Sequence, residues 1–148
     1  MFSVRDGNIN DIKSILSIEL LSFEEPWKES DILYEMTESP VAHYLVVEDD
    51  NGSIVGFVDY WITFDSATIA QIAINPSYRR IKLGSLLMDE VIKDCYAKRV
   101  ISVTLEVRTK NESAIGLYHK FGFKDVVVKP HYYKNGDDAL YMVKEVEI

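Results

Sequence analysis

Residues 67–87 read ATIAQIAINPSYRRIKLGSLL, and the rest of the chain is organised around this stretch. It begins as an apolar run rich in isoleucine, breaks at Asn75-Pro76 and enters a helical pattern at Gly84. Three cations stand between the break and the helix: Arg79, Arg80 and Lys82. The first N–H groups of a helix have no internal partner and lie at the positive end of its dipole. A strand that passes through a basic turn into a helix therefore predicts a binding site for a phosphorylated ligand.

Hydrophobic periodicity and turn residues on either side of this stretch predict one domain over residues 1–148. Helices are expected from a cap at Asn8 or Asn10 to about Phe23, and at about 30–36, 84–98 and 109–121. Strands are expected at about 2–5, 41–47, 54–64, 67–74, 100–107, 125–133 and 139–143. The order β-α-α-β-β-β-α-β-α-β-β indicates an α/β (α+β) fold, a mixed sheet covered by helices.

Three local signals support these boundaries. The run Asp49-Asp50-Asn51-Gly52 is typical of a hairpin turn. Thr109 and Glu112 have the spacing of a capping box at the start of a helix. Gly122 is expected to end that helix, with Phe123 packing back onto it.

Composition limits the class of protein. A net charge of −8 argues against nucleic acid as the main partner and is compatible with a positively charged substrate. Cys95 is the single cysteine, so no intramolecular disulfide is possible, and its place on an apolar helix face predicts burial. No apolar run approaches the roughly 20 residues that span a bilayer. We expect a cytoplasmic protein with no membrane association.

Two further stretches carry a family resemblance. Residues 105–123, LEVRTKNESAIGLYHKFGF, resemble the signature LEVR-x-x-N-x-x-A-x-x-L-Y-x-x-x-G-F of one branch of the GCN5-related N-acetyltransferases (GNAT). That branch is the N-terminal protein acetyltransferases, nearest the ribosomal-protein-alanine (RimI-like) type. Residues 79–84 resemble the pyrophosphate loop Q/R-x-x-G-x-G/A of the same family. The similarity covers residues 67–143 closely and residues 1–66 loosely.

The resemblance implies a GNAT fold, with a mixed, mostly antiparallel central sheet flanked by helices, and acetyl-coenzyme A as the cofactor. Glu106 then matches the general base and Tyr118 the general acid that protonates the coenzyme A sulfur. Matching cofactor-binding positions are Ile72, Ala73 and Ile74 in the strand, Arg79, Arg80, Ile81, Lys82, Leu83, Gly84 and Ser85 in the loop, and Asn111 and Tyr118 beyond it.

Lys82 departs from the family pattern, because it stands where the family most often has glycine. Glycine accepts a positive φ and lysine resists it. Lysine fits the loop if its backbone is right-handed, and it adds a charge near the phosphates.

The resemblance also implies a peptide groove. Tyr132 and Tyr133 match paired tyrosines that contact the first residues of the substrate, and Trp27 belongs to a segment similar to the substrate loop. Glu24 or Glu25 would add negative charge near the amine. The implied acceptor is the α-amino group of a protein or peptide N-terminus, of the ribosomal-protein-alanine or general N-alpha type.

The residues alone leave alternatives open. Glu106 fits an ordinary exposed strand position, Tyr118 a core aromatic, and Tyr132-Tyr133 an aromatic pair packing on a helix.

The activity has two alternatives: an acetyltransferase for small amines such as polyamines, and a silent acyl-coenzyme A-binding module. The three histidines lack metal-ligand spacing, so no metal site is expected. The need for a homodimer or an auxiliary subunit stays open.

Overall fold

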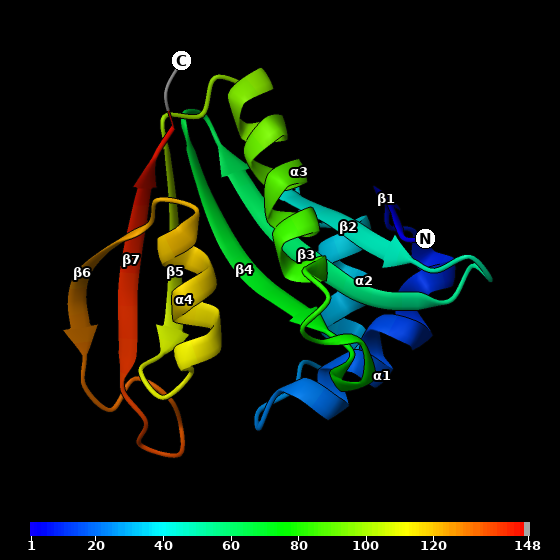
Figure 1. The fold of residues 1–148 in the computed structure, drawn as a ribbon, viewed down its shortest axis with the longest axis horizontal. Coiled ribbons are helices and arrows are strands. Elements are labelled where there is room, and N and C mark those ends of the chain that lie inside the picture. Colours follow the sequence, from blue (N-terminus) through cyan, green and yellow to red (C-terminus); the bar gives the residue numbers. More distant parts are fainter. Residues whose placement is uncertain (147–148) are drawn as a thin grey trace. The chain divides into compact units, whose positions relative to one another are not determined.

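The computed structural model describes residues 1–146, and its order of strands and α-helices is the predicted one (Figure 1). The α-helices are α1 (Ile12–Ser22), α2 (Glu29–Thr37), α3 (Leu83–Ala97) and α4 (Glu112–Lys120). The strands are β1 (Ser3–Asp6), β2 (Ala42–Glu48), β3 (Ile54–Thr63), β4 (Ser66–Ile74), β5 (Ser102–Arg108), β6 (Lys124–Lys129) and β7 (Ala139–Glu145). Short 3₁₀ helices cover Ile9–Asp11 and Pro76–Tyr78.

The chain forms two compact units, and β3, β4 and α3 each contribute residues to both. Unit 1 comprises residues 1–61 and 70–91, and unit 2 comprises residues 62–69 and the chain from Ile92 onward. The sheet is mixed and mostly antiparallel, in the order β1-β2-β3-β4-β5-β7-β6. This architecture confirms the predicted fold class. One domain over residues 1–148 stays a prediction.

Unit 1 buries its core between helices and strands. Antiparallel pairing places Val46 of β2 opposite Phe57 of β3, and both side chains are fully buried. The apolar stripes of α1 and α2 pack against them through Ile12, Ile15, Ile18 and Ile32. Because side chains alternate across a strand, Asp59 and Trp61 of β3 project to the same face as Phe57. This face carries the polar groups of unit 1 described below.

Unit 2 contains the one parallel pairing among the recorded strand registers. The first residues of β4, Ser66 to Thr68, run parallel to Ser102–Thr104 of β5. Antiparallel strands follow, with β7 beside β5 and β6 beside β7. The predicted glycine cap of α4 is confirmed: Gly122 has φ +91°, and the Phe123 N–H donates to the Tyr118 carbonyl at 3.0 Å. Cys95 is buried, as predicted.

Two predicted boundaries are wrong. The strand expected at 125–133 ends at Lys129, because Pro130 has no N–H to donate and His131 takes φ +53°. Helix α4 begins at Glu112 with Asn111 as its N-cap, so the capping box predicted from Thr109 is not the one used. The Thr109 N–H donates instead to the Asp138 carbonyl at 3.1 Å.

No helix within residues 1–146 combines the length and the apolar character that a membrane span requires.

Gly56 of β3 provides a test of this packing. A Cβ there would lie 2.5 Å from Cδ1 of Ile74 and 3.2 Å from the Ala73 carbonyl oxygen. We expect Gly56→Ala to lower the free energy of unfolding by about 1–3 kcal/mol, because the Ile74 side chain has to repack and the Ala73 carbonyl has to shift slightly. Urea denaturation measures the change.

Gly116→Ala is the matched control, because nothing lies within 4 Å of a Cβ at this position of α4. Alanine has the higher helix propensity, so this variant should be more stable by roughly 0.5–1 kcal/mol. A Gly56→Ala protein as stable as wild type would contradict the close approach.

Candidate functional site

The loop between β4 and α3 adopts the strained backbone that a glycine-rich loop would adopt easily. Arg80 has φ +68° and Lys82 has φ +65°. The right-handed backbone, which was the condition for an easy fit of Lys82, is therefore not met: the loop keeps the positive φ, and lysine adopts it at a cost. That cost is about 1 kcal/mol for each residue, because the side chain approaches the carbonyl oxygen.

The start of α3 offers unpaired donors beside this loop. The Lys82 carbonyl accepts the Leu86 N–H at 3.1 Å, so the N–H groups of Leu83, Gly84 and Ser85 precede the first intrahelical bond. The first turn contains no acidic residue. Arg80 and Lys82 are exposed. Free N–H groups, the helix dipole and nearby cations suit phosphate oxygens, so the predicted pyrophosphate loop has the chemistry that its ligand needs.

The strand segment before the loop contains the predicted pantetheine-binding residues. Ala73 is buried, and Ile72 and Ile74 are partly buried. The Arg79 Nε donates to the Ile74 carbonyl at 3.3 Å, which joins the strand end to the basic loop. Arg79 is exposed, and Ile81 beside it is half-exposed. Cofactor binding by these positions stays a prediction.

Glu106, the predicted base, lies in a polar cluster of unit 2. Its Oε2 accepts a hydrogen bond from Lys129 Nζ at 2.5 Å, and its Oε1 accepts one from the Tyr132 hydroxyl at 3.1 Å. The side chain is 27% exposed, so the carboxylate remains accessible. The hydrogen bond to Glu106 raises the pKa of Lys129. The structure thus brings together Glu106 and Tyr132, one proposed for the chemistry and one for substrate binding.

Tyr132 and Tyr133 lie in the β6–β7 loop and not in a strand. Their rings meet edge to face, with centroids 5.0 Å apart. The Arg108 guanidinium stacks 3.9 Å from the centre of the Tyr133 ring and donates to Asn135 and Asp137 of the same loop, both at 2.9 Å. Arg108 thus holds the loop, and Tyr132 extends from it to Glu106. Aromatic packing on a helix, the alternative for this pair, is not what the loop geometry shows.

Tyr118 and Asn111 sit on α4. Tyr118 is 5% exposed and packs against Phe123 at a ring distance of 5.8 Å. Burial raises the pKa of its hydroxyl, so this group keeps its proton at neutral pH. The Asn111 Oδ1 accepts the Ala114 N–H at 3.2 Å and caps the helix. Contact of either residue with a cofactor stays a prediction.

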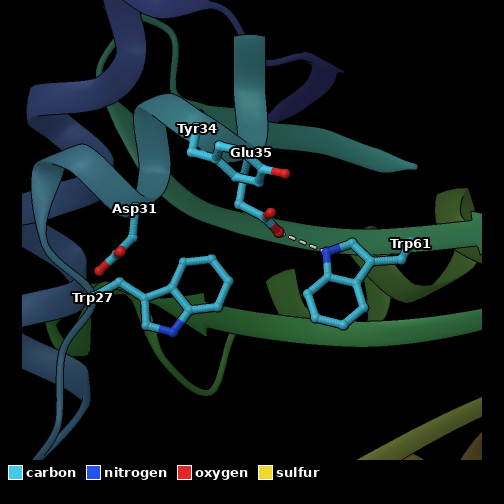
Figure 2. Close-up of a pocket in the computed structure, with 5 residues that line it drawn as sticks. All are labelled: Trp27, Asp31, Tyr34, Glu35 and Trp61. Carbon is cyan, nitrogen blue, oxygen red and sulfur yellow. Dashed lines mark hydrogen bonds between the residues drawn. The ribbon is translucent and has the colours of Figure 1, made fainter. Parts of the chain in front are cut away.

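The α1–α2 loop positions Trp27 over a pocket in unit 1. The pocket has a volume of about 330 Å³ and is lined by Trp27, Asp31, Tyr34, Glu35 and Trp61 (Figure 2). The backbone N–H of Trp27 donates to the buried Oε1 of Glu19 at 2.9 Å, which fixes the loop. Glu24 is exposed and is not among the residues that line the pocket. Substrate binding by Glu24 or Trp27 stays a prediction.

Two buried carboxyl groups in unit 1 are absent from the predicted site. Glu19 and Asp59 are both fully buried, and burial raises the pKa of Glu19 to about 6 and that of Asp59 to about 9. Neither oxygen of Asp59 has a hydrogen-bond partner within the described part of the chain. One signal was visible in the sequence, since Asp59 is the one charged residue in the apolar run IVGFVDYWI of residues 54–62.

Across residues 1–146, no group of three or more histidine, cysteine, aspartate or glutamate side chains is placed to hold a metal ion.

Similarity to known proteins extends over almost the whole chain. Residues 12–123 match the model of the acetyltransferase (GNAT) family. A Bacillus subtilis protein provisionally named a ribosomal protein bS18-alanine N-acetyltransferase is 41% identical over 141 residues, which cover 95% of this chain and 93% of the relative. An N-alpha-acetyltransferase from Sulfurisphaera tokodaii is 30% identical over 156 residues, which cover 95% of this chain and 91% of the relative.

Two solved structures have folds similar to that of this chain. The ribosomal-protein-S18-alanine N-acetyltransferase from Escherichia coli superimposes with a TM-score of 0.91 at 26% identity, covering 100% of this chain and 96% of that one. Ard1 from Thermoplasma volcanium gives a TM-score of 0.92 at 32% identity, covering 99% of each chain.

The pKa of Asp59 predicts a pH dependence of stability. The folded state keeps a proton up to about pH 9, whereas the unfolded chain releases it near the ordinary value of 3.8. The free energy of unfolding should therefore fall as pH rises through this window, by up to about 1.4 kcal/mol per pH unit. Asp59→Asn has no proton to release, so its stability relative to wild type should increase between pH 5 and pH 9.

Urea denaturation at several pH values measures this difference. The exposed Asp65→Asn at the β3–β4 turn controls for the loss of one carboxyl group. Parallel pH profiles for Asp59→Asn and wild type would show that Asp59 does not carry the effect.

Proposed function

Because this chain belongs to the acetyltransferase (GNAT) family, we propose that it acetylates the α-amino group of a protein N-terminus. It is an N-acetyltransferase that uses acetyl-coenzyme A. One observation carries the choice of acceptor. The chain aligns over nearly its full length, at 30–41% identity, with proteins named as ribosomal-protein-alanine or N-alpha-acetyltransferases. This similarity supports a ribosomal-protein-alanine or general N-alpha acceptor.

The acceptor class also agrees with proton energetics. A peptide α-amine has a pKa near 7.7–8.0, whereas lysine titrates near 10.4. Making a lysine side chain neutral at pH 7 therefore costs roughly 3.5 kcal/mol more. A single glutamate as base suits the α-amine better.

Residues of unit 1 would bind the cofactor. The N–H groups of Leu83, Gly84 and Ser85, with Arg80 and Lys82, would hold the pyrophosphate. Backbone groups of Ile72–Ile74 would hydrogen-bond the pantetheine arm. When bound, acetyl-coenzyme A supplies the thioester whose carbonyl carbon the amine attacks.

Glu106 would accept the proton that the acceptor amine loses. Its hydrogen bonds support this role, because Tyr132 orients one carboxylate oxygen while Lys129 binds the other. The Lys129 ammonium occupies a position that a substrate ammonium would also favour, so an incoming amine would displace it. Glu106 would then act on the amine directly or through water.

Tyr118 would donate a proton to the coenzyme A sulfur as it leaves. Burial keeps its hydroxyl protonated at neutral pH, so this residue holds a proton on Oη for the departing sulfur. The transfer would move the negative charge from the sulfur to Oη of Tyr118, and the phenolate would take up a proton from solvent before the next turnover.

The test is thiol release from acetyl-coenzyme A with a peptide that begins with free alanine. We expect kcat/KM to fall at least about tenfold in Glu106→Gln, and about 10²-fold in Tyr118→Phe, because each change removes a proton-transfer group. The exposed Glu145→Gln and Tyr96→Phe make the same chemical changes elsewhere in unit 2 and should retain the wild-type rate.

Each contrary outcome corrects a separate part of the proposal. Peptide-dependent release that survives Glu106→Gln would remove Glu106 as the base. Turnover of spermidine without turnover of any peptide would replace the acceptor class. Cofactor binding without turnover of any amine would indicate a silent module.

A further inference from the structure

Both tryptophans of the chain, Trp27 and Trp61, line the pocket of unit 1. Trp27 comes from the α1–α2 loop and Trp61 from β3, and α2 contributes Asp31, Tyr34 and Glu35 (Figure 2). The volume of about 330 Å³ is at the lower end of the range for ligand sites, roughly 300–1,000 Å³. A cavity of this size suits one side chain better than a whole coenzyme.

The lining is aromatic and acidic. The five lining residues are three aromatic and two acidic ones, and none of them is a cation. The Trp61 Nε1–H donates to Oε1 of Glu35 at 2.6 Å, which orients that carboxylate at the edge of an indole (Figure 2). Aromatic faces attract cations, and carboxylates strengthen the attraction. The pocket therefore favours a positively charged, flat group.

A buried carboxyl group, Asp59, lies next to two of the residues that line the pocket. Asp59 is fully buried and points to the same face of β3 as Trp61, opposite Tyr44 of β2. Glu35 and Trp61 are both close enough to act on its pKa, so Asp59 lies beside the Glu35–Trp61 pair. Neither of its oxygens accepts a hydrogen bond from the described residues. Asp59 does not line the pocket itself, so it contributes a buried carboxyl group next to the lining rather than a direct contact for a ligand.

We propose that this pocket binds the guanidinium group of an arginine side chain on a protein partner. A guanidinium is planar, stacks on indole faces, donates several N–H groups in one plane and is less strongly hydrated than an ammonium. Two indoles and two carboxylates in the lining match those properties. The net charge of −8 would draw a basic segment toward the surface. This binding goes beyond the proposed acetyl transfer, because neither Glu106 nor Tyr118, the residues proposed to move protons, lines the pocket.

The intrinsic fluorescence of the full-length protein tests the proposal directly, because the chain has no tryptophan outside the pocket. The probe is N-acetyl-arginine amide, which has the guanidinium but no free α-amine to acetylate. With acetyl-coenzyme A absent, the result is independent of whether the acetyl-transfer proposal succeeds. We expect a saturable change in emission. N-acetyl-citrulline amide, a neutral analogue of nearly the same shape, should give none over the same concentration range.

Charge-removing variants locate the site. Glu35→Gln should weaken binding of the probe at least about tenfold, because a charge-assisted hydrogen bond is lost. Asp31→Asn should weaken it about threefold or more, while its remaining amide oxygen still accepts the Lys28 N–H that caps α2. Glu38→Gln, exposed at the end of the same helix and outside the lining, is the matched control and should bind within about twofold of wild type. Near-ultraviolet circular dichroism checks folding, and Asp31→Asn decides the question if Glu35→Gln is unstable.

Four results would overturn the proposal. They are no saturable change with the arginine probe, equal binding of the citrulline analogue, tighter binding of N-acetyl-lysine amide than of the arginine probe, and unchanged affinity in both Glu35→Gln and Asp31→Asn. The third would assign the pocket to an ammonium group.

Discussion

The arrangement of unit 1 depends on the hydrogen bonds that the buried carboxyl group of Glu19 accepts. Glu19 lies on α1, and its Oε1 accepts the backbone N–H of Trp27 in the α1–α2 loop at 2.9 Å and the side-chain amide N–H of Gln71 in β4 at 3.2 Å. Burial raises its pKa to about 6 while these two hydrogen bonds oppose the rise. A group this deeply buried needs such partners, because an unpaired polar atom in a core costs stability. One side chain therefore fixes both a wall of the aromatic pocket and the strand that leads to the basic loop.

The basic loop shows how a departure from a family pattern is accommodated. Lysine at position 82 keeps the left-handed backbone that glycine would adopt without strain. The loop keeps its shape because α3 begins directly after it, and because Arg79 anchors it to the end of β4. What lysine adds is a third cation close to the free N–H groups of the helix.

In unit 2 the geometry of one loop decides the surroundings of Glu106. Pro130 and His131 turn the chain out of β6, so Tyr132 reaches Glu106 from the loop. Arg108 stacks on Tyr133 and pairs with Asp137, which ties the same loop to β5. The hydrogen bonds of Lys110, together with those of Asn135 and Arg108, hold the pKa of Asp137 below its usual range. The carboxylate of Glu106 is thus held by side chains that follow it by more than twenty residues.

The sequence by itself determined the order of the elements, the basic turn into α3, the glycine cap of α4 and the family, because each depends on residues close together in the chain. It also indicated Glu106 as a candidate base and Tyr132 as a candidate substrate contact, but it gave no sign that Lys129 binds Glu106. Only the tertiary structure decided which polar groups meet. Glu19 with Gln71, Glu35 with Trp61 and Glu106 with Lys129 are pairs separated by 52, 26 and 23 positions. Local propensity contains no information on such pairs, since the register of strands and the packing of helices bring them together.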